Sequence, residues 1–65
     1  MEQRFIELHD GGKPYLLNAN FIVCVTACDV TGKSVIRTVG EAQPYSANES
    51  YQDIVNLIRE VRYGN

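Results

Sequence analysis

The only histidine of the chain, His9, stands directly before Asp10. A histidine beside a carboxylate is a pair that general acid–base catalysis uses, but the reaction also needs a pocket and a partner nucleophile within about 3 Å. Here the pair leads into Gly11 and Gly12, where an aspartate usually serves the turn itself. We therefore expect no catalytic site at His9 and interpret the protein as a non-enzyme.

Cys24 and Cys28 lie four positions apart in the β-branched stretch FIVCVTAC, which has the composition of a strand. On a regular strand, at about 3.3 Å per residue, they would be about 13 Å apart. A disulfide needs Cα atoms within about 7 Å, so this pair cannot form one. The same distance prevents both from binding one zinc ion, and a single histidine cannot complete a four-ligand site. We expect two thiols packed as small hydrophobic side chains, with no metal and no cofactor.

Two short loops contain Gly followed by Lys, at Gly12-Lys13 and at Gly32-Lys33-Ser34. They resemble fragments of a phosphate-binding loop, but that motif connects a strand to a helix whose N-terminus holds the anion. Both loops here lie between apolar runs typical of strands. We interpret them as hairpin turns.

The charge balance argues against a polyanion partner. Six Lys and Arg side chains stand against eight Asp and Glu, giving a formal net charge of −2 in 65 residues. Nucleic-acid binding would need basic side chains clustered beside aromatic ones. The candidate cations are Arg37, Arg59 and Arg62, each with acidic residues nearby in the sequence.

Hydrophobic periodicity divides the chain into strands followed by one helix. Apolar runs predict strands at residues 4–9, 14–18, 21–28 and 34–39, with a short fifth strand within 41–45. A helix of about residues 48–62 follows from the i, i+3, i+4 spacing of Tyr51, Ile54, Val55, Ile58 and Val61. Short connections between strands favour an antiparallel meander. We predict a single α+β domain, residues 1–65, in which one C-terminal amphipathic helix packs on an antiparallel sheet of four to five strands.

The helix carries start and stop signals. Ser46 and Glu49 fit the S-x-x-E capping box, in which each side chain satisfies the other's free backbone N–H, and a start at Asn48 is chemically sound as well. Gly64 provides the expected stop.

The third predicted strand is apolar on both faces, although a single helix can cover only one face of a sheet. Ile22, Cys24 and Thr26 point to the side opposite Phe21 and Val23. Either the sheet curls so that both faces are partly buried, as small barrels do, or the second face contacts another molecule. We favour an interface that comprises Ile22, Cys24 and Thr26 on the strand, and the neighbouring Arg37.

The size of the chain supports that interpretation. A domain of this length buries only about 60% of the surface that its unfolded chain exposes. Small domains gain stability from disulfides, metals or self-association. Because the cysteine spacing argues against the first two, self-association remains.

Several segments resemble the FlbD/SwrD family of small proteins from flagellar operons. The similar stretches are FIELH at the start, a Gly-Lys turn, YLLN, a strand that opens with Phe-Ile, and ESYQDI at the helix start. The helix-after-sheet order also loosely resembles the LytTR DNA-binding domain. The resemblance to the flagellar proteins implies a small β-rich accessory protein without catalytic residues.

These observations predict a small non-enzymatic accessory protein that forms homo-oligomers or binds a protein partner. The alternative is a small nucleic-acid-associated regulatory protein, which would require the arginines to converge in space. No stretch approaches the roughly 18 apolar residues of a membrane span, and the first residues carry no apolar run of signal-peptide length. We therefore expect a cytoplasmic protein that does not insert into membranes.

Overall fold

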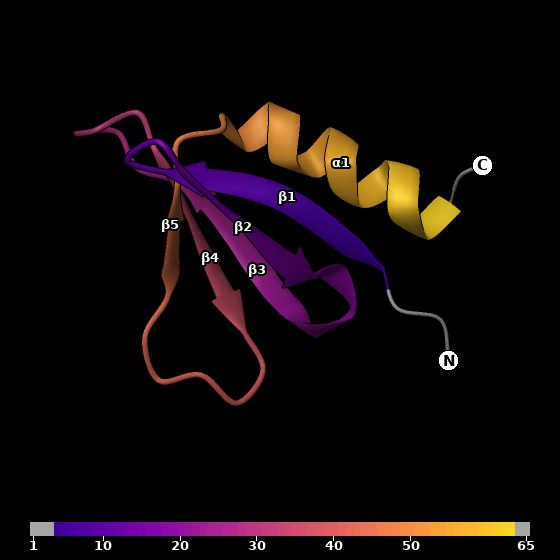
Figure 1. Cartoon of the computed structure of the whole chain (residues 1–65). Helices are drawn as coiled ribbons and strands as arrows, with labels where there is room; N and C mark the ends of the chain where they lie inside the picture. Colours follow the sequence, from indigo (N-terminus) through magenta and orange to yellow (C-terminus); the bar gives the residue numbers. More distant parts are fainter. Residues whose placement is uncertain (1–3, 64–65) are drawn as a thin grey trace.

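A computed structural model describes residues 4–63 of the chain and places five strands before one long helix (Figure 1). The elements in chain order are β1 (Phe5–Asp10), β2 (Lys13–Asn18), the short 3₁₀ helix η1 (Ala19–Phe21), β3 (Ile22–Ala27), β4 (Ser34–Thr38), β5 (Tyr45–Ala47) and α1 (Tyr51–Tyr63). All strand pairs are antiparallel. The α+β class, with a C-terminal helix packed on antiparallel strands, is confirmed.

The first two strands form a tight hairpin. Gly11 and Gly12 make up its two-residue turn and both have positive φ, +62° and +84°, which the favoured hairpin turn requires and which glycine adopts at least cost. Alternation along the strands turns Ile6, Leu8 and Leu17 into the core, where each is buried.

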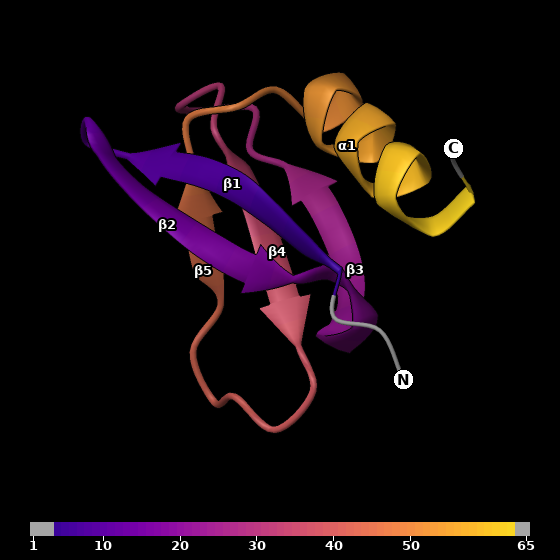
Figure 2. The ribbon, with the colours of Figure 1, turned by 45° about the vertical axis from the view of Figure 1, so that its right-hand side comes forward.

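The strands form two sheets rather than one continuous meander. The first contains β1 and β2, and the second has the order β3-β4-β5. Between them η1 turns the chain: the Asn18 side chain accepts a hydrogen bond from the Asn20 backbone N–H at 2.9 Å, and Ala19 N–H donates to the Arg4 carbonyl at 2.7 Å. Ala19 is buried at this corner. The hairpin of β1 and β2 crosses over the inner face of the second sheet (Figure 2).

A β-bulge changes the facing of β3. Ile22 pairs with Thr38, but the next pair is Cys24 with Arg37, which leaves Val23 as an extra residue. Because directly opposed residues share a face, Ile22 faces inward with buried Thr38, whereas Cys24 faces outward with exposed Arg37. Ile22 and Val25 both pack against the core.

The start of the helix differs from the expected capping box. Ser46 lies in β5, paired with Val35, and the Glu49 carboxylate binds His9. Ser50 caps the helix instead: its Oγ accepts a hydrogen bond from Asp53 N–H at 3.1 Å, and its carbonyl accepts one from Ile54 N–H at 3.0 Å. The fifth strand likewise begins at Tyr45, where the sequence suggested that it would end. Gly64, the expected stop, lies outside the described residues.

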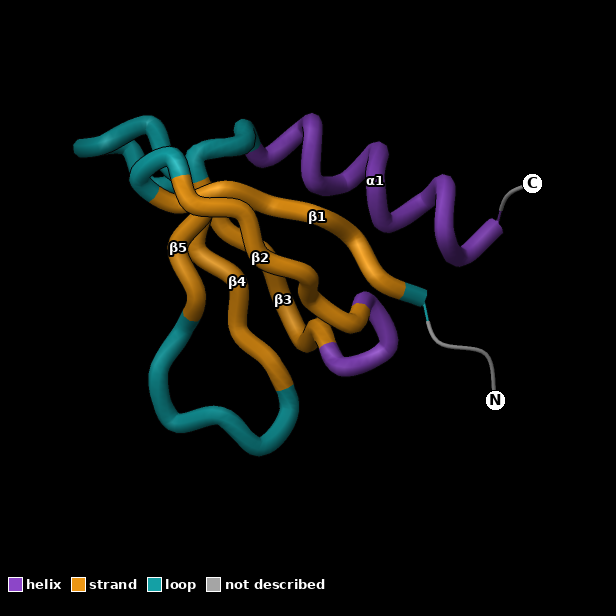
Figure 3. Tube along the Cα trace, viewed as in Figure 1, coloured by secondary structure: helices purple, strands orange, loops and turns teal. Residues whose placement is uncertain are grey.

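The helix closes one side of the core and lies beside β1 (Figure 3). Its Ile54 is fully buried, and Leu57, Ile58 and Val61 pack around the same cluster. Two arginines connect the last turn of α1 to the rest of the fold. Arg4 donates a hydrogen bond to the carbonyl of Val61, and Arg62 donates one to the carbonyl of Ala19. Among the residues that the structure describes, α1 is the longest helix, and its thirteen residues fall short of a membrane span.

The capping assignment can be tested by replacing each candidate serine with alanine. Ser50→Ala removes the acceptor for Asp53 N–H and should lower the free energy of unfolding by about 1 kcal/mol. Ser46→Ala keeps the backbone carbonyl that Ser46 contributes to the fold, so its effect should be about 0.5 kcal/mol or less. Urea denaturation followed by circular dichroism measures both, and the reverse ranking would contradict the assignment.

Candidate functional site

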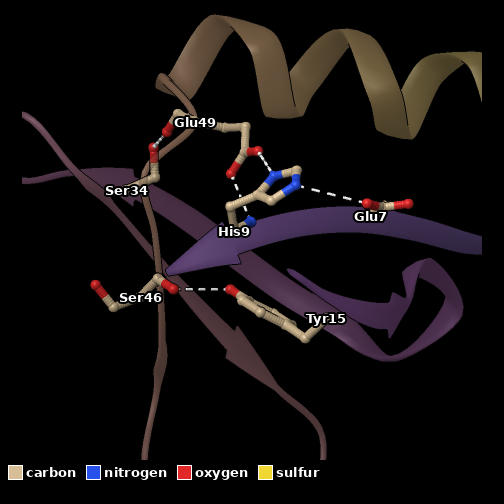
Figure 4. Close-up of polar contacts among 6 residues, drawn as sticks. All are labelled: Glu7, His9, Tyr15, Ser34, Ser46 and Glu49. Carbon is tan, nitrogen blue, oxygen red and sulfur yellow. Dashed lines mark hydrogen bonds and ion pairs between the residues drawn. The ribbon is translucent and has the colours of Figure 1, made fainter. Parts of the chain in front are cut away.

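The densest group of polar contacts lies where β1 ends and α1 is about to begin (Figure 4). Both oxygens of the Glu49 carboxylate bind His9: Oε1 accepts a hydrogen bond from the His9 backbone N–H at 3.0 Å, and Oε2 lies 2.6 Å from the ring Nδ1. On the other side of the ring, Nε2 is 3.5 Å from a carboxylate oxygen of Glu7. His9 thus lies between two carboxylates that come from different parts of the chain.

Backbone contacts hold the same junction. Asn48 N–H donates to the His9 carbonyl at 2.7 Å, and the hydroxyl of fully buried Ser34 donates to the Glu49 carbonyl at 2.8 Å. We call the contacts of His9 with Asn48 and Glu49 the His9–Glu49 clamp. It fastens the end of β1 to the segment that connects β5 with the helix.

The clamp shifts the pKa of both ionisable partners toward their charged forms. The hydrogen bond to Glu49 raises the pKa of His9, opposed by partial desolvation and assisted by the charges of Glu49 and Glu7. Burial alone would raise the pKa of Glu49, but hydrogen bonds from the His9 ring and backbone hold it below its ordinary value. The ion pair is therefore favoured at mildly acidic pH.

The neighbours of His9 in the sequence and in the fold differ. Asp10, the sequence neighbour of His9, forms an ion pair with Lys33 at 3.2 Å and thereby joins the two hairpin turns. Within residues 4–63 no group of three or more His, Cys, Asp or Glu side chains could hold a metal ion. The partner of His9 is thus Glu49, forty positions away, which sequence reasoning had assigned to a helix cap.

The cysteines are less buried than the sequence suggested, and both are free thiols. Cys24 is exposed because the bulge at Val23 turns it outward, so its expected packing inside the protein is wrong. Cys28 is partly buried at the start of the β3–β4 turn. Hydrogen bonds from the Thr31 side chain and from the backbone of Thr31 and Val30 lower the pKa of Cys28.

One face of the second sheet is covered by neither the hairpin nor the helix. Three of the four predicted interface residues, Cys24, Thr26 and Arg37, are exposed there, but Ile22 is not part of it because the bulge turns that side chain into the core. We define the outer face as these three residues together with Phe21, Val23, Val35 and Val39. Phe21, Val23 and Val39 are 56%, 64% and 66% exposed.

A second surface feature lies between β2 and β5 and was missed by sequence reasoning. The Tyr15 and Tyr45 rings stack at 5.8 Å between centroids, and the Tyr15 hydroxyl donates to the Ser46 carbonyl at 2.8 Å (Figure 4). Beside them lies an open groove of about 490 Å³, whose lining also includes Pro14, Leu16 and Pro44. Burial raises the pKa of Tyr15 to about 12, so its hydroxyl stays protonated and donating. In the sequence, the only sign of this groove was that each tyrosine directly follows a proline, in Pro14-Tyr15 and in Pro44-Tyr45.

The arginines are distributed over different parts of the surface. Arg37 belongs to the outer face of the sheet, whereas Arg59 is exposed on the helix. Arg62 donates to the Ala19 carbonyl and so serves the fold.

Comparisons of the chain with protein-family models, with curated proteins and with solved structures found no match. The resemblance to the FlbD/SwrD proteins therefore stays a prediction.

The His9–Glu49 clamp should make the free energy of unfolding depend on pH through two ionisable groups. The contribution of His9 is complete below its unfolded pKa of 6.5 and is lost as pH rises through the raised folded value. That of Glu49 is complete above its unfolded pKa of 4.5 and is lost as pH falls through the lowered folded value. The excess stability of the wild type over Glu49→Gln should therefore peak between pH 4.5 and 6.5 in urea denaturation.

Glu60→Gln, which removes an exposed carboxylate from the helix, controls for net charge. An NMR titration gives a direct reading of the clamp, because the His9 ring should titrate at a lower pH in Glu49→Gln than in the wild type. Identical midpoints in the two proteins would contradict the ion pair.

The hydrogen bonds that lower the pKa of Cys28 predict that its thiol is reactive. Thr31→Val removes the hydroxyl that contributes most to the lowered pKa, so alkylation of Cys28 by iodoacetamide at about pH 7.5 should slow severalfold. Mass spectrometry of peptides measures the rate, and Cys24 in the same molecule provides the internal reference. Equal rates at Cys28 in both proteins would show that the hydroxyl does not stabilise the thiolate.

Proposed function

We propose that this protein is a small non-enzymatic module that self-associates in the cytoplasm through its outer face. The supporting observation is the exposure of Phe21, Val23 and Val39, each more than half exposed where η1 and β3 meet the end of β4. Free thiols at Cys24 and Cys28 suit a reducing compartment.

The chemistry of the outer face favours contact over solvation. Among its residues Arg37 is the only charged one, and Thr26 is the only other strongly polar side chain. Contiguous apolar surface of this kind usually marks an interaction site, because each Å² removed from water contributes about 25 cal/mol. Arg37 suits a central position, since its long apolar stem can pack while its head finds a partner.

The area of the outer face determines how tightly we expect two copies to associate. Strands about 4.8 Å apart and about 17 Å long give a three-stranded sheet a flat area of roughly 250 Å². A standard stable interface buries about 800 Å² per partner, which would be about a sixth of the 4548 Å² of accessible surface described here. The face alone is smaller than that, so we expect reversible association that depends on concentration.

The partner that we propose for the outer face is a second copy of the same chain, which is always present at equal concentration. A two-fold axis through the sheet would pair the same apolar patch with itself. A different protein partner on the same face is the other outcome that the test below separates. The alternative of nucleic-acid binding gains no support from the described residues, since Arg62 is engaged by Ala19 and Arg37 stands apart from the helix.

The test is sedimentation equilibrium at concentrations from about 10 µM to about 1 mM, where weak complexes form. The wild type should show a mass that rises with concentration, whereas Val39→Glu should remain monomeric because a carboxylate on the outer face would be desolvated on association. The matched control is Val30→Glu, which places the same charge at a 93% exposed position in the β3–β4 turn. It should associate like the wild type.

A wild type that stays monomeric over the whole range would overturn the self-association proposal. Equal weakening by both substitutions would mean that net charge, not the outer face, controls association. Both variants change exposed side chains, so folding should be preserved, and circular dichroism verifies this.

A further inference from the structure

The groove between β2 and β5 has the composition of a site for extended peptides. Its walls contain two tyrosines and two prolines, with Leu16 alongside, which is 64% exposed. The stacked Tyr15 and Tyr45 rings lie 24° from parallel and so form a rigid aromatic wall. Tyr15 is further fixed by its hydrogen bond to the Ser46 carbonyl. A preformed aromatic surface loses little side-chain entropy when a ligand binds.

Pro14 determines which kind of peptide the groove can accept. In a hairpin with a two-residue turn the flanking pair, Asp10 and Lys13, is hydrogen-bonded, so the next residue, Pro14, has its nitrogen directed away from β1. The free edge of β2 therefore lacks one donor and carries a bulky ring. An incoming β-strand would meet this interruption, whereas a polyproline II peptide needs no ladder of backbone hydrogen bonds.

A neighbouring hollow adds a charge preference. It has a volume of about 440 Å³ and shares Pro14, Tyr15 and Leu16 with the groove, so the two lie next to each other at β2. Its charged residue is Glu7, whose side chain is 59% exposed. Asp10 is paired with Lys33, and Lys13 is a cation in the lining of the groove itself. One carboxylate oxygen of Glu7 lies 3.5 Å from the His9 ring, and the exposed remainder of this carboxylate favours a basic peptide residue at the hollow, away from Lys13.

We propose that the groove and its neighbouring hollow bind a proline-containing segment of another protein, in the polyproline II conformation, with prolines against Tyr15 and Tyr45 and a basic side chain near Glu7. Aromatic-lined grooves recognise such ligands because the peptide is preordered before binding. This site uses the hairpin side of the molecule, so it is separate from the outer face and does not depend on self-association.

The experiment is an NMR titration of ¹⁵N-labelled protein with a synthetic ten-residue peptide that has prolines at every third position and one arginine at its end. Backbone signals around Tyr15 and Tyr45 should shift, with saturation below about 1 mM peptide. A peptide with alanine at each proline should bind at least about tenfold more weakly, because it must be ordered on binding.

Two variants locate the site. Leu16→Glu should weaken binding severalfold, while Val30→Glu, which introduces the same carboxylate at a 93% exposed position away from the groove, should bind like the wild type. Glu7→Lys should reverse the charge preference, so that a peptide ending in glutamate binds better than the one ending in arginine. Leu16 and Glu7 are exposed, so both variants should fold.

Three results would overturn the proposal. One is the absence of any shift at about 1 mM peptide, and another is equal binding of the alanine peptide. The third is movement of the groove signals on dilution of the protein alone, which would make a second copy the occupant. Failure of self-association at the outer face would leave the peptide titration unaffected, so the two proposals can fail separately.

Discussion

The arrangement of this protein depends on the contact between His9 and residues 48–49. His9 uses its backbone N–H, its carbonyl and its ring there, and all three are satisfied by Asn48 and Glu49. Because these partners directly precede α1, the contact determines where β5 ends and where the helix starts. Only from that starting point does the helix run along β1 with Ile54 over the core. One local junction thus couples the hairpin, the second sheet and the helix.

The division into two sheets gives each surface of the protein a different character. The hairpin and the helix both pack on the inner face of β3-β4-β5, so the small core is shared by all the elements while the outer face stays open. A domain of this size has few side chains with which to cover a second face. The exposed apolar residues are therefore a direct result of concentrating burial on one side.

Local patterns in the sequence predicted the elements but could not predict the long-range contacts. Gly11 and Gly12 marked the hairpin, and the helical spacing from Tyr51 onward marked α1. The cap was assigned to Ser46 because the sequence cannot show that Glu49 is recruited by His9, forty residues away. A single-residue bulge at Val23 likewise moved Ile22 inward, since one extra residue inverts a pattern of period two. Whether the outer face is an interface stays a prediction.

The bulge in β3 also interrupts an edge strand of the second sheet. The two sheets have four edge strands, and each departs from a regular open edge. Strand β3 is distorted at Val23, β2 carries Pro14, the three-residue β5 accepts the Tyr15 hydroxyl at Ser46, and the backbone of β1 at His9 is bonded to Asn48 and Glu49. Open, regular edges let β-proteins add strands without end and form fibres. Copies that meet through the outer face, as we propose, would find no such continuous row of donors and acceptors to extend. A two-fold contact between these faces would then close the assembly as a pair instead of a fibre.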